Sequence, residues 1–174
     1  AAFVSRTLDR DPKHMQAILK RAHEFKGTSF VEVYQNCPVF NDEAFFAFSN
    51  KETKKDEAIF LEHGKPLIFG QNNEKGIILD GLMPKIVNIL DENISPNDLW
   101  IHDEKDKTKA NLISRFFDNL FDDVQFPRPF GVLYANERPT YDEEMEKQIK
   151  EITSKKGKMS LNNILSGDKT WEIF

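Results

Sequence analysis

Apolar residues recur every three or four positions between residues 15 and 25, which is the spacing of one helix face. Asp11 and Pro12 come directly before this pattern and are typical of an N-cap and a first helical position. Gly27 follows it, where a left-handed stop is expected. The pattern therefore predicts a helix. Its inward face is expected to contain Met15, Ile18, Leu19, Ala22 and Phe25.

Two runs rich in β-branched and aromatic residues flank this helix, at residues 2–7 and 28–35. Strand, helix and strand in this order form a βαβ unit, in which the two strands are parallel. The fold class is therefore expected to be α/β. Ligands of such sheets bind at the carboxyl ends of the strands. Cys37, the only cysteine in the chain, lies just beyond such an end.

The pattern changes after residue 42. Residues 43–57 are first aromatic and then charged, which predicts a short helix or loop followed by a solvated stretch. Residues 58–81 read as three short strands joined by turns, so we expect a meander there. Further expected elements are strands at 84–90, 99–104 and 128–135 and a helix at 107–121.

The last part of the chain is predicted to be helical. Thr140 and Glu143 form the pattern of a capping box, which begins a helix that continues to about Lys155. Met145, Ile149 and Ile152 are expected to face inward from this helix. A short helix between Ser160 and Gly167 and a terminal strand complete the expected elements.

Composition narrows the class of protein. The chain has 174 residues, of which 39% are hydrophobic and 30% charged, as in globular proteins. Its net charge of −5 argues against a nucleic-acid surface, which needs clustered Lys and Arg. There is no apolar run of membrane-spanning length and no secretion signal, so we expect a cytoplasmic protein with no membrane partner. The chain begins abruptly with strand-like residues, and we expect it to be a piece of a longer polypeptide.

The other reactive residues form no recognisable catalytic or metal motif. His14 and His23 share the first helix, but nine residues at about 100° each place them on opposite faces. The acidic runs at 103–104, 122–123 and 142–144 lack the spacing of a calcium loop. Glycine-rich phosphate loops and a G-x-S-x-G elbow are also missing. We therefore predict no catalytic residue in this chain.

Cys37 leaves several interpretations open. A lone thiol at a strand end is more often core filling than chemistry. Two features favour chemistry: the position at the end of a parallel strand, and Pro38, which restricts the backbone before it. A Cys-Pro step also occurs among iron–sulfur ligands. One cysteine cannot hold a cluster, so any further ligands would come from sequence outside this chain.

Several segments resemble the β subunit of the 2-oxoacid:ferredoxin oxidoreductases, especially the 2-oxoglutarate type. The segment DPKHMQAILKRAHEFKGTSFVEVYQNCPVFND carries the main resemblance. LEHGKPLIFG, ERPTYDEEMEKQI and GDKTWEI are similar to the C-terminal extension of a longer-tailed branch of that family. The resemblance extends over essentially the whole chain.

The resemblance implies a C-terminal half of such a β subunit. Residues 1–42 would be the last βαβ of a doubly wound domain that binds thiamine diphosphate and Mg²⁺, and residues 43–174 a C-terminal α+β extension. The family oxidatively decarboxylates a 2-oxoacid with coenzyme A and passes electrons through a 4Fe–4S cluster to ferredoxin. Cys37 matches the fourth cysteine of that cluster. An α subunit is the implied partner.

Parts of the family pattern are missing from this chain. The Gly-Asp-Gly signature of thiamine diphosphate binding and the other three cluster cysteines do not occur. We therefore expect the isolated piece to bind neither cofactor and to be inactive. The alternative is a stand-alone protein–protein interaction module in which Cys37 is structural. Phe45, Phe46 and Phe48 are candidates either for a contact surface or for core packing.

Overall fold

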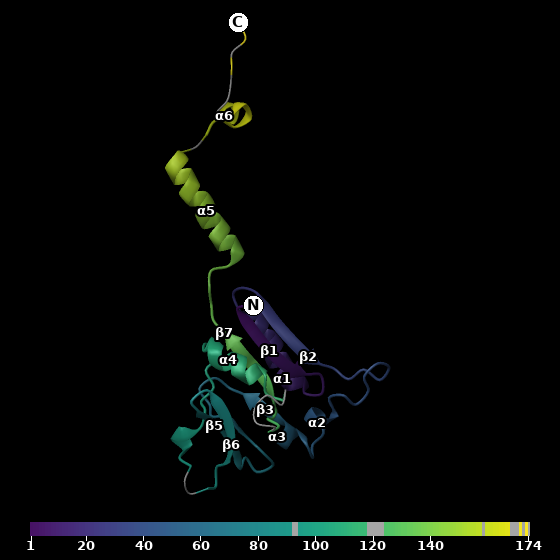
Figure 1. Ribbon diagram of the computed structural model, residues 1–174. Helices are drawn as coiled ribbons and strands as arrows, with labels where there is room; N and C mark the ends of the chain where they lie inside the picture. Colours follow the sequence, from purple (N-terminus) through teal and green to yellow (C-terminus); the bar gives the residue numbers. More distant parts are fainter. Residues whose placement is uncertain (92–93, 118–123, 158, 168–170, 172, 174) are drawn as a thin grey trace. The chain divides into compact units, whose positions relative to one another are not determined.

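The computed structural model describes residues 1–91, 94–117, 124–157, 159–167, 171 and 173. The chain divides into two compact units, Ala1–Arg138 and Pro139–Phe174. In chain order (Figure 1), the elements are β1 (Phe3–Leu8), α1 (Pro12–Glu24), β2 (Ser29–Tyr34), α2 (Phe46–Ser49), α3 (Lys54–Glu57), β3 (Ala58–Leu61), β4 (Ile68–Phe69), β5 (Lys75–Asp80), β6 (Met83–Asn88), the 3-10 helix η1 (Pro96–Asp98), α4 (Lys107–Ser114), β7 (Arg128–Ala135), α5 (Tyr141–Lys156) and α6 (Leu161–Ser166).

The first three elements form the βαβ unit that the sequence predicts. β1 and β2 pair in parallel along their whole length, so that Leu8 at the end of β1 lies opposite Tyr34 at the end of β2. Between them, α1 begins after Asp11, whose carboxylate accepts a hydrogen bond from the His14 N–H. Pro12 occupies the first helical position, where its missing N–H costs no hydrogen bond. The predicted cap and helix are therefore confirmed.

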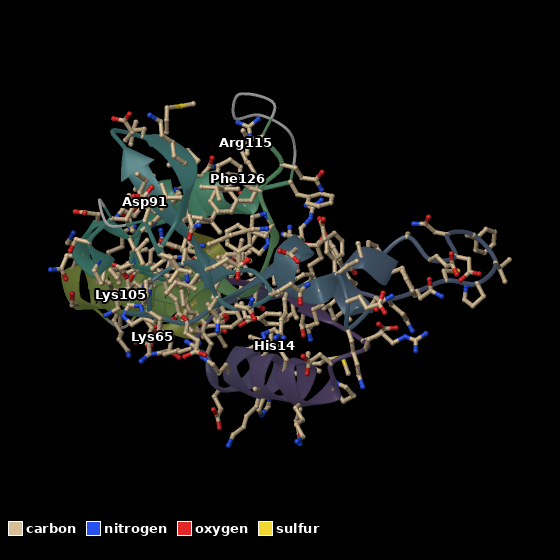
Figure 2. The ribbon with its side chains drawn as sticks, turned by 90° about the horizontal axis from the view of Figure 1, so that it is seen from below. His14, Lys65, Asp91, Lys105, Arg115 and Phe126 are labelled. Atoms are coloured by element: carbon tan, nitrogen blue, oxygen red, sulfur yellow. The ribbon has the colours of Figure 1, made fainter. Side chains whose placement is uncertain are left out.

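Helix α1 packs on the sheet through a narrower face than predicted. Ile18 is buried against Phe3 of β1 and Val132 of β7. Leu19 was expected on the same inward face, but its side chain is 45% exposed. One turn closer to the N-terminus, His14 extends toward the sheet (Figure 2), and its Nδ1 lies 2.8 Å from Thr7 Oγ1. The buried face is narrow because only one side of α1 touches the sheet.

The central sheet has four strands in the order β2-β1-β7-β3. β7 runs antiparallel to β1 and parallel to β3, so the sheet is mixed and β2 and β3 form its two edges. The prediction that residues 58–61 begin a meander is therefore wrong, because this strand pairs with β7 instead. The expected α/β class is confirmed at the level of a mixed α/β structure with parallel strands. The predicted boundary between 1–42 and 43–174 stays a prediction.

A second sheet contains β4, β5 and β6, all antiparallel. β4 and β5 confirm the last two strands of the expected meander, and β6 confirms the strand expected at 84–90. Residues 99–104 were predicted to form a strand, and this is wrong. They contribute two isolated bridges, from Leu99 to Ile78 and from Ile101 to Pro66. Trp100 between them is buried in the larger core cluster.

The short helices of the first unit follow the predicted pattern only in part. α2 and α3 are one turn each, in the region expected to be a short helix and then a solvated stretch. The helix expected at 107–121 ends earlier, since α4 stops at Ser114. Phe116 lies beyond its end and is fully buried. Residues 118–121 of that predicted helix, and the acidic pair at 122–123 that follows it, lie outside the described residues.

The second unit contains α5 and α6 with the predicted caps. The Thr140 side chain accepts a hydrogen bond from the Glu143 N–H, and the Glu143 carboxylate accepts one from the Thr140 N–H. Ser160 caps α6, and Gly167 follows it. The expected terminal strand falls largely outside the described residues. None of the described helices combines the length and the apolar character needed to cross a bilayer.

The inward orientation predicted for the apolar face of α5 is wrong. Met145, Ile149 and Ile152 are 39%, 58% and 51% exposed. Their spacing does make one apolar stripe, as predicted, but nothing within this unit covers that stripe among the described residues. Amphipathic spacing indicates that a helix has an apolar and a polar face. It does not indicate whether the apolar face packs against another part of the same chain.

Gly131 of β7 provides a test of the central sheet. Its φ is +119°, and a Cβ at this position would lie 2.7 Å from the Leu61 carbonyl oxygen of β3. Gly131→Ala should therefore lower the free energy of unfolding by at least about 2 kcal/mol, because both the backbone conformation and the main-chain contact resist a side chain. Urea unfolding of the purified protein measures the change.

Gly81→Ala is the matched control. Gly81 also has a positive φ, +63°, but an added Cβ there would meet no atom within 4 Å. Its cost should be limited to the left-handed backbone, about 1 kcal/mol. Equal losses in the two variants would contradict the close approach of β7 to β3.

Candidate functional site

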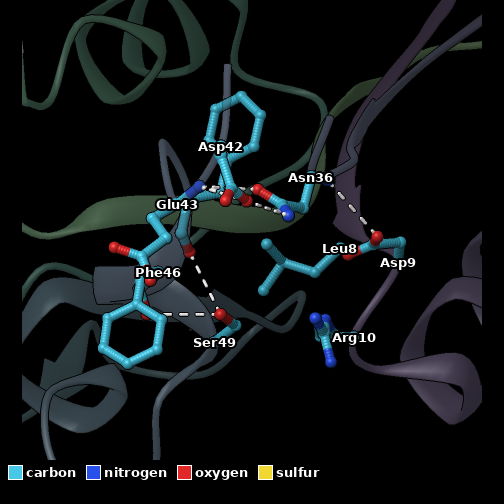
Figure 3. Close-up of a pocket in the computed structure, with 9 residues that line it drawn as sticks. Leu8, Asp9, Arg10, Asn36, Asp42, Glu43, Phe46 and Ser49 are labelled. Carbon is cyan, nitrogen blue, oxygen red and sulfur yellow. Dashed lines mark hydrogen bonds between the residues drawn. The ribbon is translucent and has the colours of Figure 1, made fainter. Parts of the chain in front are cut away.

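The carboxyl ends of β1 and β2 lie side by side and open onto a pocket of about 170 Å³ (Figure 3). Three carboxyl groups and one guanidinium dominate its polar lining, which disfavours an anionic ligand. The polar lining residues are Asp9, Arg10, Asn36, Asp42, Glu43 and Ser49. Leu8, Phe45 and Phe46 add apolar walls. The sequence predicted a site at this end of the parallel strands.

The loop after β2 is held in one conformation by its own side chains. We call residues 36–43 the Cys37 loop. Asn36 Nδ2 donates a hydrogen bond of 2.9 Å to Asp42 Oδ1, and Asn36 Oδ1 accepts one of 2.8 Å from the Glu43 N–H. The Asn36 N–H donates to Asp9 at the end of β1. The start and the end of the loop are therefore joined to each other and to the sheet.

An aromatic pair anchors the loop from both sides. Tyr34, the last residue of β2, stacks on Phe45, with ring centroids 4.3 Å apart. Beneath this pair, Phe48 and Phe130 are buried in the same cluster. Offset ring pairs of this kind stabilise beyond their buried area. The chain therefore leaves the core at Tyr34 and returns to it at Phe45, so that only the loop between them projects from it.

A tight turn within the loop surrounds the Cys37 thiol with backbone donors. The Asn41 N–H donates a hydrogen bond of 2.9 Å to the Cys37 carbonyl, which closes the turn. Hydrogen bonds from the backbone N–H groups of Phe40, Val39 and Asn41 lower the pKa of the Cys37 thiol, and they outweigh the opposing effects of burial and of the Asp42 charge. The turn therefore favours the thiolate, which is the form that binds metals.

The donor set of this site fits one ligand of a metal centre and no more. Cys37 is partly exposed, whereas a core-filling thiol would be buried. Among the described residues, no group of three or more His, Cys, Asp or Glu side chains is arranged to hold a metal ion. A thiolate that accepts backbone N–H bonds is the usual environment of an iron–sulfur ligand. Cys37 can therefore contribute to a cluster only together with ligands from elsewhere.

The histidines do not gather at this site. His14 bonds to Thr7, and burial lowers its pKa. His102 is almost fully buried, its Nε2 lies 2.8 Å from the Val132 carbonyl oxygen, and burial lowers its pKa as well. His63 lies beside Asp103 at the surface. None of these three histidines lines the pocket at the ends of β1 and β2.

The aromatic candidates divide between core and surface. Phe48 is buried and Phe45 is partly buried, so both pack within the protein. Phe46 is exposed and lines the pocket. Sequence reasoning did not single out Asn36 and Asp42, which hold the loop. Asn and Asp on either side of a turn are the available signal, because their side chains bond to nearby backbone.

The comparisons with known proteins concern nearly the whole chain. No family model matches it. The chain is 30% identical over 177 residues to the 2-oxoglutarate oxidoreductase subunit KorB of Mycobacterium tuberculosis, a match that covers 99% of this chain and 46% of that protein. It also matches the solved 2-oxoglutarate:ferredoxin oxidoreductase from Magnetococcus marinus, with 2-oxoglutarate, coenzyme A and succinyl-CoA bound, at a TM-score of 0.55 and 19% identity, covering 98% of this chain and 41% of that one.

The sequence match bears out the resemblance found in the sequence, because the matched curated protein is a 2-oxoglutarate oxidoreductase subunit. In particular, the chain is similar to part of a 2-oxoglutarate oxidoreductase subunit, and it spans about half the length of that curated relative. The solved structure supports the fold independently, since at 19% identity the likeness concerns the backbone.

The Cys37 turn predicts a measurable thiol reactivity. In the metal-free protein, Cys37 should react with iodoacetamide with a half-maximal pH below about 8.5, the value of an unperturbed cysteine, because the N–H donors favour the thiolate. Asn36→Ala removes the bonds that close the loop and should move this half-point upward. Mass spectrometry of the alkylated peptide across a pH series measures both.

Asn111→Ala, on the exposed side of α4, is the control for this measurement. It should leave the half-point of Cys37 alkylation where it is in the unchanged protein. The arrangement of the turn would be contradicted if Cys37 alkylation in the folded protein had the same pH dependence as in the urea-unfolded protein.

Proposed function

We propose that this chain is the C-terminal portion of the β subunit of a 2-oxoacid:ferredoxin oxidoreductase. The observation that carries the proposal is the 30% identity to a 2-oxoglutarate oxidoreductase subunit along 99% of the chain. A stand-alone interaction module is not favoured, because the similarity covers 99% of the chain and so includes both units. The parent enzyme would oxidatively decarboxylate a 2-oxoacid with coenzyme A and transfer the electrons to ferredoxin.

Within that subunit, Cys37 would be one ligand of a 4Fe–4S cluster. The cluster, when bound, would accept and pass on single electrons. Cys37 would supply a thiolate, and the N–H groups of Val39, Phe40 and Asn41 would stabilise its negative charge. The Asn36–Asp42 contacts would keep these donors in place. The three remaining ligands would come from the part of the subunit that this chain does not contain.

The same proposal assigns the rest of the chain a supporting role. Residues 1–42 would end the doubly wound domain that binds thiamine diphosphate and Mg²⁺, and residues 43–174 would form the extension. No residue of this chain is proposed to bind thiamine diphosphate. An α subunit, ferredoxin and coenzyme A are the proposed partners, in the cytoplasm. 2-Oxoglutarate is the favoured 2-oxoacid, because the names of both matched proteins contain it.

The complete enzyme tests the proposed reaction. The full-length β subunit, purified together with its α subunit, should reduce ferredoxin when 2-oxoglutarate and coenzyme A are both present, and should form succinyl-CoA. Absorbance of ferredoxin under anaerobic conditions and mass spectrometry of the thioester measure the two products. The proposed reaction would be wrong if ferredoxin were reduced equally well without coenzyme A. It would also be wrong if no 2-oxoacid led to ferredoxin reduction.

Substitution of Cys37 tests its role separately. Cys37→Ala in the full-length subunit should remove the cluster or leave it incomplete, because a four-cysteine site loses a ligand. Iron per subunit should fall at least about twofold, and ferredoxin reduction should fall by about tenfold or more. Iron analysis and electron paramagnetic resonance measure the first effect. Ser114→Ala at the end of α4 is the control, and it should keep full iron content. Full iron content in Cys37→Ala would remove Cys37 from the ligand set.

A further inference from the structure

Two large apolar side chains stand exposed at the tip of the Cys37 loop. Val39 is 81% exposed and Phe40 is 90% exposed. They are neighbours in sequence and lie on the part of the loop that carries the thiol. The connection between β2 and α2 extends away from the central sheet (Figure 1), so this tip is accessible from outside the unit. Large exposed apolar side chains that adjoin a reactive group are typical of contact surfaces.

The tip is presented in a fixed conformation. The Asn36–Asp42 and Asn36–Glu43 hydrogen bonds close its base, and the stack of Tyr34 on Phe45 anchors both of its ends in the core. A loop that is built in this way loses little conformational freedom when a partner binds it. The Phe40 side chain is therefore exposed on a loop whose conformation is fixed by these contacts.

The thiol and the tip belong to the same tight turn. Cys37 begins this turn, Val39 and Phe40 lie within it, and the hydrogen bond from the Asn41 N–H to the Cys37 carbonyl oxygen closes it. Any polypeptide that brings further ligands to a metal on the Cys37 sulfur must approach within a few ångströms of this turn. It then reaches the side chains of Val39 and Phe40 too, so the partner of the tip and the source of the missing ligands are expected to be one segment.

The identity of that segment follows from the number of cysteines and from the length of the relative. This chain has a single cysteine. The match covers 46% of the KorB subunit, so more than half of that one polypeptide lies outside the matched part. A segment of the same subunit is therefore available to supply the ligands, with no need for a second protein.

We propose that Val39 and Phe40 form the docking surface on which a cysteine-bearing segment from the remaining part of the same β subunit packs, and that this contact shields the cluster from water. This inference rests on the proposed function and deepens it. The apolar pair would replace solvent around the cluster edge, and solvent access is one of the factors that control the stability and potential of such clusters.

Site-specific photo-crosslinking in the intact enzyme tests the proposed contact. Phe40 is replaced by benzoylphenylalanine in the full-length β subunit, which is then purified with its α subunit and irradiated. The crosslinked peptides should come from the same β subunit and should include the segment that carries its other cysteines. Leu82, which is 66% exposed in the turn between β5 and β6, is replaced in the same way as a control and should not crosslink to that segment.

A second variant tests the shielding. Phe40→Ser should still acquire iron, but its cluster absorbance should bleach in air at least about fivefold faster than in the unchanged enzyme, because water and oxygen reach it. Leu82→Ser should bleach at the unchanged rate. Crosslinks from position 40 to the α subunit, to a second β subunit or to added ferredoxin would overturn the inference. So would bleaching of Phe40→Ser at the unchanged rate.

The same preparations separate this inference from the proposed function. An unchanged full-length enzyme that contains no iron, or that does not reduce ferredoxin with 2-oxoglutarate and coenzyme A, would overturn the proposed function and with it the inference. An iron-replete, active enzyme whose position 40 crosslinks to another chain would overturn the inference alone.

Discussion

Strand β7 lies between β1 and β3, and the central sheet depends on this placement. β7 follows the second sheet and α4 in sequence, but it pairs with β1 at the beginning of the chain and with β3. One side chain reinforces the arrangement across three strands: Arg6 of β1 forms an ion pair of 2.6 Å with Glu32 of β2 and donates to the carbonyl oxygen of Pro129 in β7. Without β7, β1 and β2 would form a two-stranded pair, which is marginally stable alone.

The candidate site depends on the same sheet. Phe130 of β7 lies under Tyr34, in an edge-to-face contact with ring centroids 5.6 Å apart, and Tyr34 in turn stacks on Phe45. The Cys37 loop is thereby fixed by a strand from a distant part of the sequence. The loop closes its own base through the hydrogen bonds of Asn36 with Asp42 and Glu43, and the distant strand fixes where this base lies on the sheet.

Local signals in the sequence predicted what local physics determines. The caps at Asp11 and Thr140 were found because a side chain and a backbone N–H a few residues away decide them. The pairing of β3 with β7 and the solvent exposure of Ile149 were not found, because both depend on which surfaces meet in space. At the site, the resemblance pointed to Cys37, but the closure of its loop by Asn36 could be seen only in the structure.

The outer edge of β2 has a practical consequence. Among the described strands, β2 pairs only with β1, and its residues Phe30 and Val33 are 57% and 40% exposed. A strand edge with open backbone groups and apolar side chains is a template for pairing with other molecules, and Glu32 is the charged residue that interrupts it. This edge of β2 therefore favours association between molecules in the concentrated solutions that crystallisation needs.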